Sequence, residues 1–240
     1  MGWKVLRLLN GLLNAAIILV LIAAGLYSVY SIWDNNSIYE AALNLQVKLK
    51  ELKPDEKKPS FEALRKINPD VAAWITLEGT KIDDPVVQGK DDQEYLNKNV
   101  YGKYALSGSL FLDSRCNRDF TDFYQLIYGH HMEKHAMFGD LDLYLKKDFF
   151  RKHTEGTLMV PGKTYPLKIL AVMKVSAFDS LVFDPEECSR EPDKILELIL
   201  KKNKAINREL FNKVKDREDE YSILALSTCS SEKADERTIV

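Results

Sequence analysis

The strongest constraint in this sequence is an uncharged apolar segment close to the N-terminus. Residues 8–30 form a run of 23 positions without a charged side chain, and residues 15–24 are apolar without interruption. At a rise of about 1.5 Å per residue, a helix of this length measures roughly 34 Å and crosses a hydrocarbon core of about 30 Å. We therefore predict a transmembrane signal anchor over residues 8–33.

The charges on either side of this segment indicate its orientation. Lys4 and Arg7 precede it, whereas Asp34 and Glu40 follow it. Basic residues are retained on the cytoplasmic side of a membrane. The sequence thus predicts a single-pass protein of the cell membrane, with residues 1–7 in the cytoplasm and the C-terminal domain outside the cell.

A cleaved signal peptide is the alternative interpretation of the same segment. Ala23, Ala24 and Gly25 are small, as residues before a cleavage site are. The apolar stretch is longer than the core of a usual signal peptide, however, and the bulky residues Leu26 and Tyr27 follow directly. The pattern favours an uncleaved anchor.

The remainder of the chain has the composition of one globular domain behind a linker. Of the 240 residues, 45% are apolar and 29% are charged, and the net charge of −2 gives no electrostatic reason to expect nucleic-acid binding. Residues 37–52 have an imperfect helical periodicity that stops before Pro54, and residues 53–60 are mostly charged. We expect a helical stalk or linker over residues 34–60 and a folded domain over residues 61–240.

Short strand-like runs dominate this domain. They are rich in β-branched and aromatic residues, and Gly, Pro, Asp or Asn bound them. Several short strands with helical insertions favour a mainly β fold with helices (α+β), closed or nearly closed into a barrel. Strands are expected at residues 82–87, 106–112, 123–128, 157–160, 165–175 and 221–226, a hairpin turn at 161–163, and helices at 61–67, 139–153 and 192–214.

Cys229 lies directly after the last strand-like run, where a loop at the edge of a sheet can expose its thiol. Ser227, Thr228 and Ser230 surround it, which argues against an apolar pocket. A buried cysteine that acts as a small hydrophobic residue is the alternative. A thiol becomes a nucleophile when a nearby base or cation favours the thiolate, and the chain holds two candidates for such a group.

The first candidate is His130, at the end of another strand-like run. Gly129 before it permits a close approach of the backbone, and an imidazole can accept or donate a proton near neutral pH. Residues 131–135 resemble a zinc motif, but the zincin pattern has glutamate directly after the first histidine, and here it comes one place later. We expect no metal site, and we expect the other histidines to be exposed: His131, His135 and His153.

The second candidate is Arg237, eight residues after Cys229. An arginine at such a position is most often a surface charge. Beside the thiol, its fixed cation could stabilise a thiolate or the oxyanion of a tetrahedral intermediate. The expected constellation is a Cys229 nucleophile, a His130 proton-transfer partner and an Arg237 cation.

Three motifs, in this order along the chain, resemble the signature of the sortase family: Gly-His at 129–130, Leu-Ser-Thr-Cys at 226–229 and Arg-Thr-Ile-Val at 237–240. The resemblance covers residues 61–240, about three-quarters of the chain. The helices before the barrel and the long helix before the cysteine run are most similar to class B sortases. Papain-type proteases have the cysteine before the histidine, and the caspase pentapeptide is absent. Supporting similarities lie at residues 74–75, 85–88, 95–96 and 108–113.

The resemblance implies an eight-stranded sortase barrel and a transpeptidation that needs no cofactor. The thiolate of Cys229 would attack a Thr–Gly or Thr–Asn bond in an LPxTG-like or NPxTN-like sorting signal of a secreted protein and form a thioacyl enzyme. His130 would protonate the leaving amine, and Arg237 would contact the substrate and the oxyanion. An amino group of a peptidoglycan precursor (lipid II) or of a pilin lysine would then release the product. Ser227 and Thr228 correspond to positions that line the substrate groove.

The C-terminal segment departs from the usual sortase pattern. Three residues follow Arg237, where a sortase completes its final strand, so we expect few ladder hydrogen bonds to hold the arginine. Because a fold does not guarantee a function, a sortase-like binding or scaffold module without catalysis is the alternative. Cys116 and Cys188 match no motif and are expected to be structural.

Overall fold

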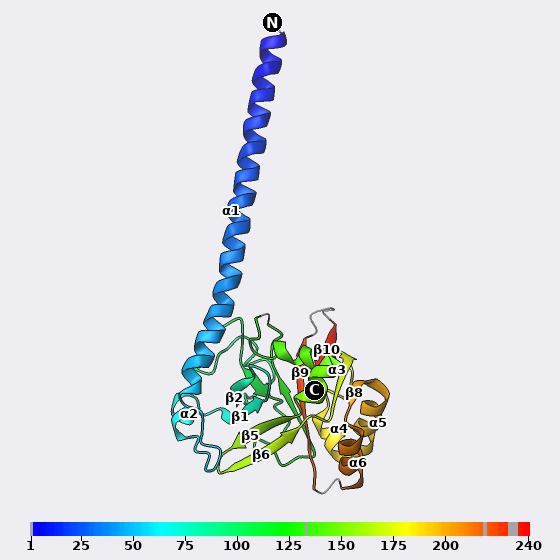
Figure 1. Ribbon diagram of the computed structural model, residues 1–240. Helices are drawn as coiled ribbons and strands as arrows, with labels where there is room; N and C mark the ends of the chain where they lie inside the picture. The colour runs from blue at the N-terminus through cyan, green and yellow to red at the C-terminus, as the bar shows by residue number, and fades with distance from the viewer. Residues whose placement is uncertain (1, 133, 218–219, 230–234) are drawn as a thin grey trace. The chain divides into compact units, whose positions relative to one another are not determined.

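The computed structural model describes residues 2–132, 134–217, 220–229 and 235–240. The chain divides into two compact units, Met1–Ala41 and Ala42–Val240. Helix α1 (Gly2–Lys50) begins in the first unit and ends in the second. The other helices and all the strands belong to the second unit (Figure 1).

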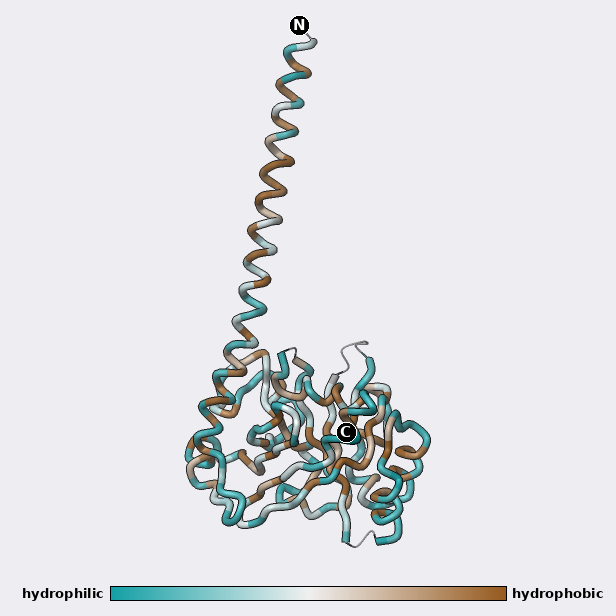
Figure 2. The backbone as a smooth tube through the Cα atoms, in the orientation of Figure 1, coloured by the Kyte–Doolittle hydropathy of each residue, from teal (hydrophilic) through white to brown (hydrophobic). Residues whose placement is uncertain are grey.

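Helix α1 contains the predicted anchor. It is continuous over 49 residues, so it passes through residues 8–33 and into the predicted stalk without a break. An 18-residue window within it has a mean hydropathy of 2.3 and is not buried, and Figure 2 shows apolar residues gathered in its N-terminal part. Among the described residues, α1 is the one helix long and apolar enough to cross a membrane. Its end at Lys50 agrees with a periodicity that stops before Pro54.

One ten-stranded sheet forms the framework of the second unit, in the order β6-β5-β1-β2-β3-β4-β9-β10-β7-β8. The sheet curls into a half-barrel with β6 and β8 at its edges (Figure 1). The predicted mainly β fold with helices is confirmed, although the sheet has ten strands rather than eight. The strands are β1 (Val71–Leu77), β2 (Asp83–Val87), β3 (Leu110–Leu112), β4 (Tyr124–Tyr128), β5 (Glu155–Val160), β6 (Lys163–Lys168), β7 (Ala171–Ser176), β8 (Asn203–Ile206), β9 (Ile223–Cys229) and β10 (Glu236–Ile239).

Several strands lie where the sequence pattern predicts them. β1 is an almost continuous apolar run, and six of its seven residues are buried, as expected for a strand with a neighbour on each side. β5 and β6 form the predicted hairpin, in which Gly162 has a φ of 80° that suits glycine. The run predicted at residues 165–175 is two strands, because the chain crosses at 169–170 from one part of the sheet to another.

One predicted helix is wrong. The periodicity of residues 192–214 predicts a single helix, but strand β8 separates α5 (Pro192–Lys202) from α6 (Arg208–Asp216). Asn203 ends α5, because its side-chain amide donates to two carbonyl oxygens of the last turn, at 2.9 and 2.8 Å. Asn207 then begins α6 by accepting a backbone amide of the first turn at 3.1 Å. The other helices are α2 (Glu62–Ile67), the 3₁₀ helix η1 (Gly139–Leu145), α3 (Lys147–Lys152) and α4 (Pro185–Arg190).

Two clusters of buried apolar side chains stabilise this unit. The smaller one joins Leu49 at the end of α1 to Trp74 of β1. The larger one includes Leu126 of β4, Leu226 of β9 and Phe138 in the loop after β4. Burial of each large side chain contributes about 1.5–3 kcal/mol, so this packing supports the ends of β4 and β9 firmly.

Candidate active site

The sheet brings the predicted site residues together on two neighbouring strands, β9 and β10, and on the loop after β4. β4 pairs in parallel with β9, with Tyr128 opposite Ser227, and the Gly129 amide donates to the Ser227 carbonyl oxygen at 3.1 Å. His130 therefore lies two residues beyond the end of β4, and this end of β4 lies beside the end of β9. β10 then pairs antiparallel with β9, and Arg237 is the register partner of Cys229. The side chain of Cys229, and all of Ser230, lie outside the described residues.

The strand that carries Arg237 is held on both sides. β10 has β9 on one edge and β7 on the other, and two further backbone hydrogen bonds join Leu226 and Val240, at 2.9 and 3.1 Å. The expectation that few ladder bonds hold the arginine is thus wrong. The expectation failed because the sequence shows how short this strand is but not that it pairs with another strand on each side. Arg237 is half-buried, and its Nη1 donates to the Glu236 carbonyl oxygen at 3.1 Å.

Two hydrogen bonds hold His130. Its Nε2 lies 2.8 Å from the Leu96 carbonyl oxygen, and its own carbonyl oxygen accepts the Phe138 amide at 3.1 Å. A carbonyl oxygen only accepts, so Nε2 carries a hydrogen and Nδ1 is the ring atom left for proton transfer. The predicted close approach at Gly129 is confirmed, because a Cβ there would lie 2.5 Å from the Leu110 side chain.

The other histidines differ from the expectation that all three are exposed. His135 is exposed, although its Nδ1 lies 2.5 Å from an Asp140 oxygen. His131 and His153 are half-buried. His131 Nε2 lies 3.2 Å from an Asp142 carboxylate oxygen, and His153 stacks on Phe149. Sequence adjacency gave no sign of these contacts, because the partners come from η1 and α3. Within the described part of the chain, no group of three or more His, Cys, Asp or Glu side chains could hold a metal ion.

Ser227 and Thr228 precede Cys229 in β9 and are both 2% exposed. Thr228 is the register partner of Thr238, and its hydroxyl has no hydrogen-bond partner among the described residues. The two residues thus lie below the surface of the site rather than on an open wall. Their contact with substrate stays a prediction.

Cys116 and Cys188 are buried, as expected of structural cysteines. Burial raises the pKa of each thiol to about 12. The Cys188 thiol donates to the Leu181 carbonyl oxygen at 3.1 Å. Because the thiol form is inert towards electrophiles, these two residues are poor nucleophiles at neutral pH.

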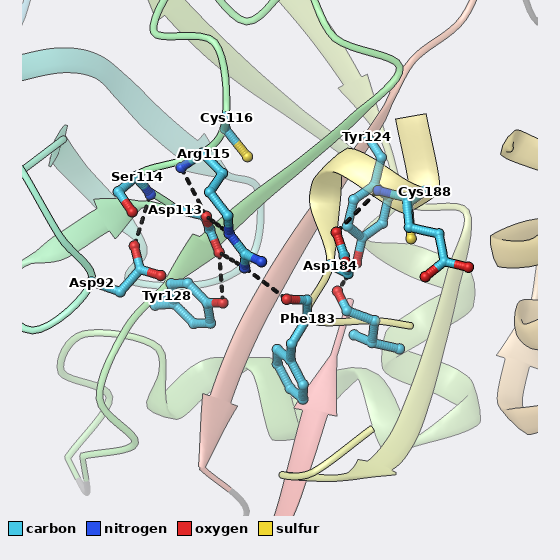
Figure 3. Close-up of polar contacts among 12 residues, drawn as sticks. Asp92, Asp113, Ser114, Arg115, Cys116, Tyr124, Tyr128, Phe183, Asp184 and Cys188 are labelled. Atoms are coloured by element: carbon cyan, nitrogen blue, oxygen red, sulfur yellow. Dashed lines mark hydrogen bonds and ion pairs between the residues drawn. The ribbon is translucent and has the colours of Figure 1, made fainter. Parts of the chain in front are cut away.

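A polar cluster around the buried Asp113, which sequence reasoning missed, supports the end of β4 (Figure 3). Asp113 is fully buried, and its carboxylate accepts hydrogen bonds from Arg115, at 3.0 and 2.8 Å, and from the Tyr128 hydroxyl, at 2.9 Å. Burial, with Asp113 beside it, raises the pKa of Tyr128, which keeps the hydroxyl a donor. Arg115 also donates to the Phe183 carbonyl oxygen at 2.7 Å. Because Tyr128 lies two residues before His130, the cluster ties that strand end to the segment before α4.

Two exposed apolar side chains belong to segments that contact the site. Leu96, whose carbonyl oxygen contacts His130, is exposed. Phe178 is 81% exposed, and the residue before it donates its amide to the Asp235 carbonyl oxygen, next to β10, at 2.7 Å. These two side chains therefore belong to the segments that border His130 and Arg237.

Comparisons with known proteins agree with this geometry. No protein-family model matches the chain. Over 172 residues it is 33% identical to sortase B of Staphylococcus aureus, across 72% of this chain and 68% of that protein. Over 121 residues it is 36% identical to sortase B of Listeria monocytogenes, across 50% and 49%. A crystal structure of a Streptococcus pyogenes class B sortase involved in pilus biogenesis superposes with a TM-score of 0.65 and 39% identity, across 75% of this chain and 95% of that one.

The curled sheet, the positions of His130 after β4, Cys229 on β9 and Arg237 on β10, and these similarities show that the chain belongs to the sortase family. Its relatives also indicate the class within this family. Both curated proteins are sortase B and the S. pyogenes structure is a class B enzyme, so the chain is of the class B type, as the sequence predicted.

Proposed function

We propose that this class B sortase is a cysteine transpeptidase, with Cys229 as the nucleophile, His130 as the proton-transfer partner and Arg237 as the cation on the oxyanion side. The register of β9 and β10 carries the proposal, because it makes Arg237 the direct partner of Cys229. The parallel pairing of β4 with β9 supports it, because it brings the residue after Gly129 to the same end of the sheet.

In the proposed first half-reaction, Cys229 gives its proton to Nδ1 of His130, while Nε2–H stays bonded to the Leu96 carbonyl oxygen. The thiolate attacks the carbonyl carbon of a threonine in the sorting signal, and the C=O electron pair moves to oxygen. The Arg237 guanidinium stabilises this oxyanion. When the intermediate collapses, the C–N bond breaks and His130 protonates the leaving amine, which leaves a thioacyl enzyme.

In the second half-reaction an amino nucleophile attacks the thioester carbonyl. Neutral His130 accepts the proton of the attacking amine, the C–S bond breaks, and Cys229 is released as an amide bond forms. The acceptor amine belongs to lipid II or to a pilin lysine. The S. pyogenes relative involved in pilus biogenesis supports the pilin lysine, since it is 39% identical to this chain.

The proposed substrates are secreted proteins with LPxTG-like or NPxTN-like sorting signals. Each of these motifs begins with residues that have apolar or amide side chains and no charge. Leu96 and Phe178, whose segments contact His130 and the residue before β10, expose apolar side chains that suit such a segment better than a charged one. We also propose that residues 8–33 anchor the protein in the cell membrane with the N-terminus in the cytoplasm, which places the catalytic domain where secreted substrates pass.

The test uses full-length protein in detergent, a panel of peptides with the two kinds of motif, and an added amine. Mass spectrometry should detect a thioacyl adduct and an amide product, and Cys229→Ala should abolish both. A thiol-reactive probe should label Cys229 alone, since Cys116 and Cys188 are buried. Absence of cleavage for every peptide, with poor labelling of Cys229, would instead identify an inactive scaffold module.

A further inference from the structure

We infer that Asp142 is a positioning residue that couples the loop of His130 to the strand of Arg237. The inference rests on the proposed function, because it gives His130 and Arg237 their importance. Asp142 itself is assigned no contact with the substrate.

Asp142 contacts two segments that are far apart in sequence. Its Oδ1 accepts a hydrogen bond from the Thr238 hydroxyl at 2.6 Å, and its Oδ2 lies 3.2 Å from Nε2 of His131. The three residues belong to η1, to β10 and to the loop after β4. Thr238 is fully buried and the His131 side chain is 18% exposed, so water competes little for either contact.

Each of these two partners is the chain neighbour of a proposed catalytic residue. His131 follows His130, and Thr238 follows Arg237. Consecutive Cα atoms are about 3.8 Å apart across a planar peptide, so holding one side chain limits how far the next residue can move. A misplacement of about 1 Å in an active site can lower a rate about 10²-fold.

The link also reaches the strand of Cys229. Thr238 is the register partner of Thr228, the residue before Cys229. A carboxylate suits this bridging position, because both of its oxygens accept hydrogen bonds at once. Asp142 thus contacts the chain neighbour of His130 and the chain neighbour of Arg237. Through Thr238 it is also linked to β9, because Thr238 pairs with Thr228 in the sheet.

The test is a double-mutant cycle on cleavage of a sorting-signal peptide by the full-length protein. Thr238→Val keeps the side-chain shape and removes the hydroxyl, and Asp142→Ala removes the bridge. Each single change should lower kcat about 10- to 100-fold with KM little changed, and the double variant should be no worse than Asp142→Ala alone. The matched control is Asp148→Ala, since Asp148 is an exposed acid that pairs with Arg151, and it should leave kcat unchanged.

The inference would be overturned if the losses of kcat in the two single variants added up in the double variant, or if Tm fell while kcat stayed unchanged. Either result would mean that Asp142 and Thr238 act only as separate structural contacts. If the unaltered protein cleaves no peptide, the proposed function fails, and the coupling is judged by nitrogen NMR of the His130 ring and the Arg237 guanidinium. Asp142→Ala should shift both sets of signals and Asp148→Ala should shift neither. Unchanged signals in Asp142→Ala would overturn the coupling on their own.

Discussion

The backbone carbonyl oxygen of Leu96 lies 2.8 Å from Nε2 of His130, so the imidazole is held by a segment that precedes it by 34 residues. This segment is itself closely packed. Gly108 has a φ of 59°, and a Cβ there would lie 2.5 Å from the Leu96 carbonyl oxygen. The contact leaves Nδ1 as the ring nitrogen available for the proposed proton transfer.

Replacing His130 by alanine should lower kcat/KM about 10²- to 10⁴-fold, the range for loss of a general acid–base group. His130→Gln can still donate to the Leu96 carbonyl oxygen but cannot exchange a proton, so it should be as inactive as His130→Ala. His131→Ala should cost less, because His131 contacts Asp142 and not the substrate. The measurement is peptide cleavage by the three variants, and a larger loss for His131→Ala would mean that the wrong histidine has been assigned.

Arg237→Ala should lower kcat more than it raises KM, because in the proposed mechanism the guanidinium acts on charge that develops in the transition state. Loss of one such donor costs about 10²–10³ in kcat, or about 2.7–4 kcal/mol. Arg237→Lys keeps the charge but loses the planar fork, so it should recover little. Arg217→Ala is the control, since Arg217 is an exposed arginine paired with Glu220. A near-normal rate for Arg237→Ala would leave a Cys–His dyad as the whole mechanism.

Gly129→Ala tests the packing beneath the proposed base. A Cβ at this position would lie 2.5 Å from Leu110 Cδ2 and 2.6 Å from Phe138 Cδ2, and both of these side chains are buried. Overpacking of this kind costs about 1–3 kcal/mol of unfolding free energy, and the resulting shift of His130 should reduce cleavage. The control is Gly11→Ala, where a Cβ would meet no atom within 4 Å apart from its chain neighbours and the backbone of its own helix. Urea unfolding and peptide cleavage measure the two effects, and unchanged values for both would contradict the packing argument.

Stability should depend on pH through Asp84. Burial is the main cause that raises its pKa from an ordinary 3.8 to about 6. The folded protein therefore holds this proton more tightly than the unfolded chain, so the contribution to stability is complete below about pH 4 and is lost as the pH rises through about 6.

Asp84→Asn should remove this dependence. The neutral amide can still accept the hydrogen bond from Gln46, which lies 2.8 Å from the Asp84 carboxylate. The free energy of unfolding should rise relative to the unaltered protein above pH 7, by roughly 3 kcal/mol at most, and the two proteins should converge near pH 4. Urea unfolding of the full-length proteins across this pH range is the measurement. A constant difference between the two curves would show that Asp84 does not titrate as described.

The membrane orientation predicts a simple proteolysis result. If residues 1–7 are cytoplasmic and residues 8–33 form an uncleaved anchor, protease added to intact cells without a cell wall should digest the catalytic domain. The same domain should be protected in inverted vesicles. Protection in intact cells, or a mature N-terminus near Gly25, would contradict this orientation or favour the cleaved signal peptide.

Local sequence patterns predicted much of the fold. The runs at 82–87 and 123–128 are strands β2 and β4 to within one residue, and the hairpin at 161–163 joins β5 to β6. These elements were predictable because propensity, apolar runs and turn residues act over a few neighbouring positions. The break in the predicted helix over 192–214 was not predictable in this way. Asn203 ends the first helix and Asn207 begins the second, and the residues between them pair with β7 as strand β8.

The sequence by itself determined the residue types of the candidate site and the family to which the chain belongs, since the order Gly-His, Thr-Cys and Arg is retained in the linear chain. Only the tertiary structure decided that Arg237 lies opposite Cys229, that the Leu96 carbonyl oxygen contacts His130, and that Asp142 contacts both Thr238 and His131. Thr238 and Asp142 are 96 residues apart in sequence. Contacts over such separations depend on which strands pair and in which register, and no local pattern records that choice.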